Sequence, residues 1–366
     1  MSALPVPLTR RGPLRYTLVR HLMYALLAAV LLLVLTSSVS AYRDFQIANV
    51  GYYVVAVAGL TVLTGLNGQI SLGHGALMMV GAYTAALLLE RDNPLPTTVV
   101  MVLCVVVTAV VGALVGAAAA RLRGPYLAGA TLAFAVGLPG LTSHYAGTLG
   151  GDNGLTVLTG PPPASLGVDF APERWQAWIT LSGALITLVL LANLASSRVG
   201  RSFRAVRDDE VSAELAGIHV ARTQVLAFVV SAACAGLAGG LLALVSGQAT
   251  PGAFTVALSL ALLAGAVLGG LGSLAGAVYG AIALVALPAL SSNASDRFDF
   301  GTDVKSNLPL LVYGALLVIV MLAAPQGLQG GVRRLLGLVR GGPSAPVRND
   351  PVTDAVPEVS VTTPER

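Results

Sequence analysis

The sequence predicts an all-α, polytopic integral membrane protein, and three observations lead to this prediction. First, 55% of the 366 residues are hydrophobic and only 10% are charged, with a mean hydropathy of +0.80. A soluble domain carries about 25% charged residues, so this chain has too little polar surface to be solvated by water alone. Second, apolar runs of spanning length recur along the chain. Third, arginine is concentrated in alternate connecting segments.

The apolar runs predict about ten transmembrane or re-entrant helices, because only helices satisfy their backbone groups in lipid at this length. In order, the runs are residues 22–40, 46–66, 70–89, 97–120, 126–146, 175–195, 224–247, 255–270, 274–290 and 308–324. Residues 1–21 then form a cytoplasmic arm, 22–324 the transmembrane domain and 325–366 a cytoplasmic tail. The tail is rich in proline, valine, threonine and charge, which is typical of a disordered segment.

Charge asymmetry predicts the orientation of these spans. With ten spans and a cytoplasmic N-terminus, the inner segments hold 16 of the 21 lysines and arginines and the outer segments hold 5. We therefore expect a multi-pass protein with both termini in the cytoplasm. The first run has a second interpretation, because Arg10 to Arg20 and the apolar run ending near Ala41 resemble a cleavable secretory signal. We favour an uncleaved first helix, since the later spans need no removable signal.

The sequence holds no catalytic constellation, so the protein is not expected to be an enzyme. Its only lysine, Lys305, follows FGTDV rather than a glycine-rich turn, so no P-loop for ATP is predicted. GLGSLA, starting at Gly270, matches a dinucleotide pattern formally, but it lies in a membrane hairpin. No histidine pair has ligand spacing with Cys, Asp or Glu, so no metal site is predicted. Cys104 and Cys234 are expected to be buried small hydrophobes. No nucleic-acid partner is expected.

Many glycines recur at four-residue spacing, which puts small residues on one helical face and lets neighbouring helices approach closely. The repeats are Gly112 and Gly116, Gly236 and Gly240, Gly265 and Gly269, and Gly272, Gly276 and Gly280. We predict that they pack helices within one subunit, and a subunit interface is the alternative.

One long charged segment, residues 196–223, separates two spans. Its nine charges would cost over ~20 kcal/mol at the bilayer centre, at about 2.5 kcal/mol each, so the segment must lie in water. An interrupted apolar stripe is formed by Phe203, Val206, Val211 and Leu215, and Gly217 is a plausible C-terminal stop. Together they predict one short amphipathic helix over residues 201–217. Such a stripe suggests docking in a partner's groove, and a helix lying on the bilayer surface is the alternative.

Four blocks of the sequence stand out together. They are GLNGQISLGHGALMMVGAYTAALL, YLAGATLAF followed by LGGDNGL, GRSFRAVRDDEVSAELAGIHVARTQVLAFVVSAACAGLAGGLLA, and LAGAVLGGLGSLAGAVYGA. These blocks resemble the permeases of bacterial branched-chain amino acid ABC importers, and in particular the M-type of their two paralogous permeases. The blocks occur in the family's order and cover most of residues 45–325. The N-terminal arm and the tail after Arg340 lie outside the resemblance.

The resemblance implies a set of partners in a bacterial inner membrane. They are a second, paralogous permease, two ATPase subunits that bind the ATP, and an extracytoplasmic substrate-binding protein, while this chain binds no cofactor itself. The helix at 201–217 would then couple the ATPases to the translocation path by existing in two states. The residues expected to serve this coupling are Arg201, Phe203, Arg204, Arg207, Asp208, Glu210, Glu214 and Gly217.

The glycine-rich stretch from Gly65 to Gly75 is expected to break the helix between two spans. Non-helical backbone at membrane depth is tolerated where it is buried or lines a cavity, and a zwitterionic amino acid needs local polarity there. The residues of this translocation path or helix break are Gly65, Asn67, Gly68, Gln69, Ser71, Gly73, His74 and Gly75. They either contact substrate or stabilise a tight turn near the cytoplasmic face.

Other functions stay open at this point. The same architecture could import urea, short amides or aromatic acids, because selectivity in such importers rests largely with the binding protein. The outer loops, residues 146–175 and 291–307, hold six of the nine external acids and are candidates to dock that protein. A secondary transporter is less favoured, because every Asp and Glu is expected to lie in a loop or tail, leaving none for ion coupling.

Overall fold

The computed structural model describes residues 14–37, 39–90, 95–122, 125–158, 160, 162–163, 166–167, 170–297, 311, 314–315 and 327–331. Nearly all regular structure in these ranges is helical, as the composition predicts. The predicted tail falls outside them except at 327–331, and so does the predicted span at 308–324 except at three positions.

The helices follow the apolar runs of the sequence. The first half of the chain forms α1 (Leu14–Ser37), α2 (Ala41–Leu60), the π-helical turn η1 (Thr61–Leu66), α3 (His74–Leu89), α4 (Thr97–Ala119), α5 (Pro125–His144), α6 (Ala146–Leu149), η2 (Gly151–Asn153) and β1 (Leu155–Thr156). The second half forms α7 (Pro172–Ser196), α8 (Arg198–Asp208), α9 (Glu210–Leu215), α10 (Val220–Ser246), β2 (Gln248–Ala249), η4 (Pro251–Ala253), α11 (Val256–Gly269) and α12 (Leu274–Arg297).

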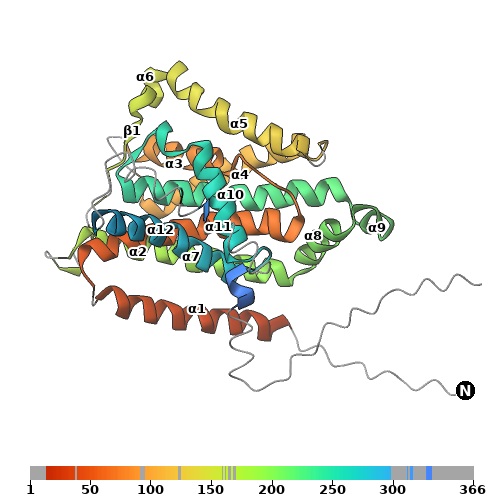
Figure 1. The fold of residues 1–366 in the computed structure, drawn as a ribbon, viewed down its shortest axis with the longest axis horizontal. Helices are drawn as coiled ribbons and strands as arrows, with labels where there is room; N and C mark the ends of the chain where they lie inside the picture. The colour runs from red at the N-terminus through yellow and green to blue at the C-terminus, as the bar shows by residue number, and fades with distance from the viewer. Residues whose placement is uncertain are drawn as a thin grey trace, which may run out of the picture. The chain divides into compact units, whose positions relative to one another are not determined.

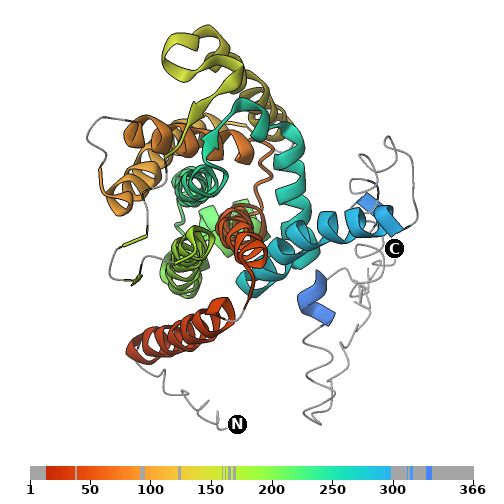
Figure 2. The same cartoon turned by 90° about the vertical axis from the view of Figure 1, so that its left-hand side faces the viewer.

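Helix α10 lies at the centre of the bundle. It packs against α2, α3 and α4, while α2 also packs against α7 and α12, and α11 pairs with α12 (Figure 1). Figure 2 shows α2 and α10 nearly end-on, surrounded by the other helices. Helix α1 lies outside this group against α7, where His21 Nδ1 and Asn193 Oδ1 are 3.0 Å apart.

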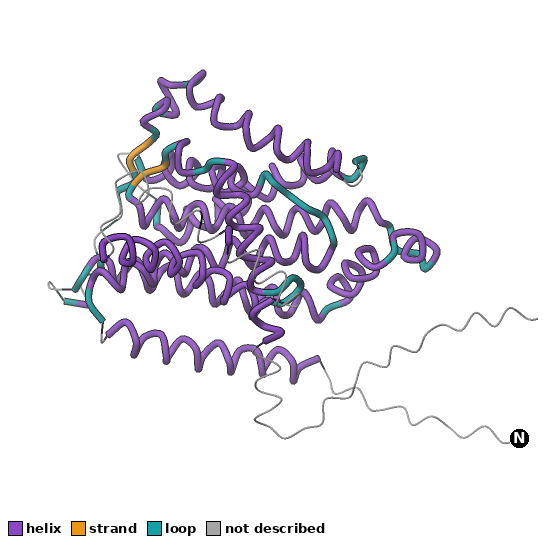
Figure 3. Tube along the Cα trace, viewed as in Figure 1, coloured by secondary structure: helices purple, strands orange, loops and turns teal. Residues whose placement is uncertain are grey.

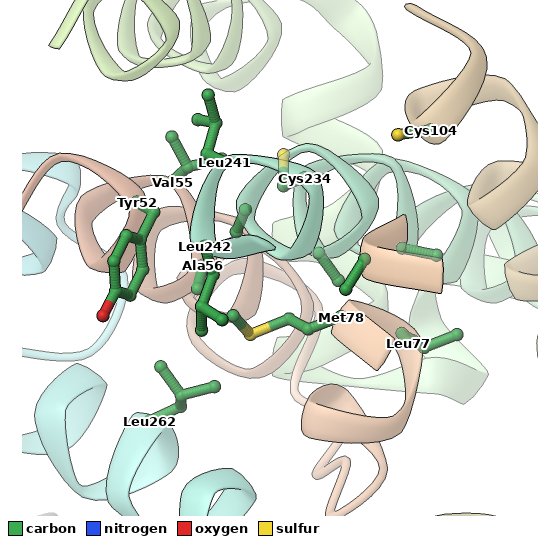
Figure 4. Close-up of a cluster of buried hydrophobic side chains, with 14 of the residues drawn as sticks. Tyr52, Val55, Ala56, Leu77, Met78, Cys104, Cys234, Leu241, Leu242 and Leu262 are labelled. Carbon is green, nitrogen blue, oxygen red and sulfur yellow. The ribbon is translucent and has the colours of Figure 1, made fainter. Parts of the chain in front are cut away.

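The core is built from apolar side chains of α2, α3, α10 and α11, some of which are drawn in Figure 4. Close helix contacts depend on glycine. A Cβ on Gly59 would overlap Cys234, and one on Gly81 would overlap the backbone of Gly236. All of the predicted small-residue repeats except Gly272 lie in helices and meet helices of the same chain, for example Gly112 against Ala232. The prediction of packing within one subunit is therefore confirmed for these helical glycines, whereas Gly272 lies in the loop between α11 and α12 with a φ of +83°. Cys104 and Cys234 are buried and free, as predicted.

The two ends of the bundle differ. At one end, β1 and β2 form a short antiparallel pair, with Leu155 opposite Ala249 (Figure 3). At the other end lie α8 and α9 (Figure 1). The charged segment and the β1–β2 pair therefore lie at opposite ends, as expected for a water-facing segment on one side of a membrane.

Six helices in the described part of the chain are long and apolar enough to cross a membrane. They are Ala41–Leu66, Thr97–Ala119, Tyr126–His144, Pro172–Ser196, Val220–Ser246 and Pro251–Gly269, with two shorter apolar helices, His74–Leu89 and Leu274–Leu290. These helices support a polytopic membrane protein, but the predicted count of about ten is not confirmed. Helix α1 begins at Leu14, so the last residues of the predicted arm are helical.

Candidate functional site

A helix break follows α2, where the sequence predicts it. The helix widens into the π-turn Thr61–Leu66 and ends at Asn67, and α3 begins only at His74. Gly68 has a φ of +78°, a left-handed conformation that favours glycine, and its amide donates to Thr64 O at 3.1 Å. Isolated π-turns inside helices are frequent at functional sites, so this break is the first candidate.

The chain after the break runs back along α2. His74 Nε2 donates to Ala56 O at 3.1 Å. Ala56 precedes Leu66 by ten residues, about 15 Å of helix, so α3 begins well inside the bundle rather than at its end. Its 16 residues extend about 24 Å, less than the ~30 Å of a hydrocarbon core. Helix α3 alone is therefore too short to cross the hydrocarbon core, and most of its residues are buried in the bundle.

Two other helices hold the first turn of α3. The Gly75 amide donates to Ser259 Oγ of α11 at 2.9 Å, and the Leu72 amide donates to Thr131 Oγ1 of α5 at 3.1 Å. Gly73 approaches α5 so closely that a Cβ there would lie 2.8 Å from Thr131 O. The break therefore connects α2 to α5 and α11 through direct hydrogen bonds.

The polar residues of the break are buried. Asn67 is 3% exposed, and His74 is fully buried. Both side-chain heteroatoms of Asn67, Gln69 Oε1 and His74 Nδ1 have no protein partner within the described residues. Burying polar atoms without hydrogen bonds is unfavourable, so these groups suit a role in binding water or a polar solute. Ser71 Oγ, by contrast, accepts a 3.4 Å bond from the Gly73 amide and so stabilises the turn.

The charged segment forms two helices, so the prediction of one helix over residues 201–217 is wrong. Ser197 caps α8 through its hydroxyl, which accepts from the Val199 and Gly200 amides. Asp209 is extended, ends α8 and caps α9. The Ser212 amide and hydroxyl and the Val211 amide donate to the Asp209 carboxylate, and these bonds lower its pKa. The carboxylate offers a stronger local partner than continued helix would provide.

The predicted end at Gly217 is confirmed. Gly217 has a φ of +84° and donates to Glu214 O at 2.9 Å, while the Ile218 amide donates to Ala213 O at 3.0 Å. These two bonds form a Schellman motif, which satisfies the last carbonyls of α9. The short α9 is therefore capped at both ends.

The apolar stripe of this segment points in two directions. Phe203 and Val206 of α8 are buried in the subunit, with exposures of 0% and 2%, whereas Val211 and Leu215 of α9 are 67% and 85% exposed. Phe203 was expected to couple to a partner, but its side chain belongs to the core of this chain. The surface open to a partner is instead on α9. The sequence pattern did not show that the two halves of the apolar stripe face different ways.

Several predicted coupling residues also have partners within the chain. Arg207 Nη1 donates to Gly65 O at 2.8 Å, and its Nε and Nη2 donate to Asp208 Oδ1 at 2.9 and 2.7 Å. Glu210 Oε1 accepts from Gln224 Nε2 at 2.9 Å. The structure thus brings the two predicted sites, the coupling segment and the helix break, into direct contact.

The remaining coupling candidates lie toward the surface. Arg201 and Glu214 are exposed, Arg204 is partly buried, and Arg201 Nη1 lies 3.5 Å from Ser196 O. Among the described residues, no cluster of His, Cys, Asp or Glu side chains could hold a metal ion.

An ion pair that sequence reasoning missed joins α2 and α7. Asp44 lies in the first turn of α2 with its side chain fully buried, and Arg174 Nε is 3.3 Å from Asp44 Oδ2. Arg174 also lies over the Phe170 ring. The expectation that every acid lies in a loop or tail is therefore wrong for Asp44, and also for Glu173 in the first turn of α7. One carboxylate oxygen of Asp44 pairs with an arginine 130 residues away, while Asp44 Oδ1 has no partner among the described residues, and no local pattern could have revealed this pairing.

These features define a class of protein. An all-helical membrane domain with a broken helix inside the bundle, contacted by a capped and charged helix pair at one end, has the architecture of a transport permease. Known proteins identify the family within that class. Residues 43–321 match the family described as branched-chain amino acid transport system / permease component, and this chain belongs to that family and to its M-type branch.

Individual relatives agree. The chain is 32% identical over 312 residues to the high-affinity branched-chain amino acid transport system permease protein LivM of Salmonella typhimurium, covering 79% of this chain and 70% of the relative. Identity to LivM of Escherichia coli is 31% over the same length. The corresponding LivH protein of Salmonella typhimurium is 30% identical over 292 residues, covering 76% of this chain and 91% of the relative. No solved structure matches the chain.

Proposed function

We propose that this chain is the M-type permease subunit of an ATP-driven importer that moves branched-chain amino acids into the cytoplasm. It would pair with a second permease of the paralogous type, two ATPase subunits and an extracytoplasmic binding protein. ATP would be bound by the ATPases alone. The relatives named LivM and LivH support a pair of paralogous permeases.

One observation carries the coupling part of the proposal, the exposed apolar surface of α9. Leu215 is 85% exposed and Val211 67%, although both lie in α9, which is capped at both ends and packs against α8 and α10. Burying one such side chain in a partner's groove contributes about 1.5–3 kcal/mol. The rim of charged residues, including Glu214, would orient the partner.

The helix break supplies the second part of the proposal, the path. Asn67, Gln69 and His74 have polar atoms without a protein partner among the described residues. His74 lies where α3 begins inside the bundle, whereas Asn67 and Gln69 follow η1 on the side of α8. A zwitterionic amino acid passing nearby would find hydrogen-bonding groups at that depth. The positive-inside charge distribution supports placing α8 and α9, with both termini, on the cytoplasmic side of the inner membrane.

Reconstitution of the complete complex in liposomes tests the function. We expect leucine uptake that requires ATP and the binding protein, and no uptake of urea. Uptake of urea, a short amide or an aromatic acid without leucine would instead assign the same architecture to that cargo. Transport by the purified chain without ATPases would refute the importer and favour a secondary transporter.

A matched pair of variants tests the docking surface. Leu215→Ser should prevent co-purification of the ATPases, because it removes the most exposed apolar side chain of α9. Leu158→Ser removes a leucine that is 72% exposed beside β1, at the opposite end of the bundle, and should retain the ATPases. Equal retention in both variants would refute α9 as the docking surface.

A further inference from the structure

The guanidinium of Arg207 occupies a junction between three elements. Its Nη1 donates to Gly65 O at the end of η1, 142 residues earlier in the chain. Gly65 in turn contacts the loop between α11 and α12, because a Cβ on Gly65 would overlap the Gly272 amide nitrogen and lie 2.8 Å from its Cα. A Cβ on Gly272 would be 3.8 Å from Arg207 Nη1. Helix α8, the break and the α11–α12 loop therefore meet at one side chain.

The backbone of the helix break contacts the Arg207 side chain at two points. A helix leaves the carbonyls of its last turn without intrahelical donors, and Gly65 lies in the last turn before Asn67. Arg207 supplies a charged donor to that carbonyl. The stem of Arg207 lies against Gly68, where a Cβ would be 2.9 Å from Arg207 Cγ. Both the carbonyl of Gly65 and the left-handed turn at Gly68 thus hold one arginine.

Arg207 is also fixed within α8. Asp208 Oδ1 accepts from its Nε and Nη2, which leaves Nη1 directed at Gly65. The guanidinium is planar and rigid, so a bond at one edge constrains the other. Helix α8 itself is held by its buried Phe203 and Val206. A displacement of α8 would therefore be delivered to the break through a short chain of charge-assisted bonds.

We propose that Arg207 is the positioning residue that transmits movement of the α8–α9 pair to the helix break, rather than a contact to the ATPase. This inference rests on the proposed importer function and assigns the link inside the permease. From Gly65 the movement continues to the first turn of α3, which Ser259 and Thr131 connect to α11 and α5. The broken helix then responds to the docking surface without contacting it.

The coupling ratio of the reconstituted complex provides the first test. Arg207→Gln should keep the ATPases bound and ATP hydrolysis intact, but lower the amino acid transported per ATP by about tenfold, the effect of losing a charge-assisted hydrogen bond that favours one state. Arg207→Lys, which retains the charge and one donor, should recover part of the ratio. Arg198→Gln, an exposed charge on the same helix, is the matched control and should behave as the wild type.

A distance measurement provides a test that needs no substrate. Spin labels at Ser202→Cys on α8 and Ile70→Cys in the break report whether the two move together; the native cysteines are buried. With ATP, we expect an unchanged distance in the wild-type background and an altered or broadened one in Arg207→Gln. This readout decides the role of Arg207 whatever the cargo is, whereas absent leucine uptake by the wild type would refute only the proposed function.

Three outcomes would overturn the inference. The first is loss of ATPase binding in Arg207→Gln, which would make Arg207 a docking residue. The second is a wild-type coupling ratio and label distance in that variant. The third is a coupling ratio that falls equally in Arg198→Gln. If Arg207→Gln does not reach the membrane, Asp208→Ala replaces it. That variant removes the acceptor that orients the guanidinium and should lower the coupling ratio by a smaller factor, and an unchanged ratio would overturn the inference.

Discussion

Gly239 offers the sharpest test of how the bundle is packed. It lies in α10 where that helix crosses α3, and its neighbour Gly240 faces α4 instead. A Cβ on Gly239 would overlap the Met78 carbonyl oxygen and lie 2.6 Å from the carbonyl carbon and 2.9 Å from Cα, where an ordinary contact needs at least 3.4 Å. All three atoms belong to the backbone, so no side-chain rotation can relieve the overlap.

The expected magnitude follows from what must move. In Gly239→Ala, α3 and α10 have to separate, and such overpacking costs about 1–3 kcal/mol of the free energy of unfolding, with the upper end expected for a backbone clash. In Gly240→Ala the nearest atoms are Cys104 Sγ at 3.1 Å and Met101 Cε at 3.2 Å. Methionine is flexible and can shift, so that variant should lose less than about 1 kcal/mol.

Thermal denaturation of the purified chain in detergent measures the difference. Gly129→Ala provides a second control, because nothing lies within 4 Å of its added Cβ. We expect the denaturation midpoint to fall clearly in Gly239→Ala, and to change little in Gly240→Ala and Gly129→Ala. Equal midpoints for Gly239→Ala and Gly240→Ala would refute the close approach of α3 to α10 and, with it, the packing around the broken span.

Three further predictions concern single contacts. Arg174→Ala should lower the free energy of unfolding by on the order of 3 kcal/mol, because it leaves the buried Asp44 carboxylate unpaired; denaturation of the double variant with Asp44→Ala should show part of that loss recovered. Asp209→Ala should weaken ATPase co-purification, while Asp209→Asn should largely keep it, since an amide oxygen can still cap α9. The lowered pKa of Asp209 means that its cap stabilises α9 above the ordinary pKa and is lost only as pH falls through the lowered value, so ATPase binding should not change between pH 6 and pH 8 on this account. Ser259→Ala should slow transport and cost about 1–3 kcal/mol in denaturation assays by leaving the Gly75 amide without its acceptor, whereas Ser259→Thr should keep the bond.

The position of the helix break along the chain could be predicted from the sequence. Glycine density together with Asn67 and Gln69 inside an apolar run predicted non-helical backbone, and the structure has it there. How deep in the helix bundle the chain resumes as α3 could not be predicted. The turn at Gly65 does lie at the end with α8, as the topology suggested, but His74 lies beside Ala56, deep in the bundle. Local sequence specifies that a helix stops, while neighbouring helices decide where the next one starts.

The charged segment shows the same division. Nine charges predicted that residues 198–222 face water, and a glycine stop predicted the helix end near Gly217 that the structure has, because charge solvation and left-handed backbone are local properties. The stripe of Phe203, Val206, Val211 and Leu215 did not indicate that its two halves face opposite ways. A capping aspartate turned the chain between them.

By itself, the sequence predicted a helical membrane permease, most of the long apolar helices, the helix break after α2 and the end of the charged segment at Gly217. Those properties follow from hydropathy, charge and glycine, which act over a few residues. Only the tertiary structure decided that Arg207 bonds to Gly65 and that Asp44 pairs with Arg174, across 142 and 130 residues. Such pairs have no local signature, because their energy depends on which helices the core brings together.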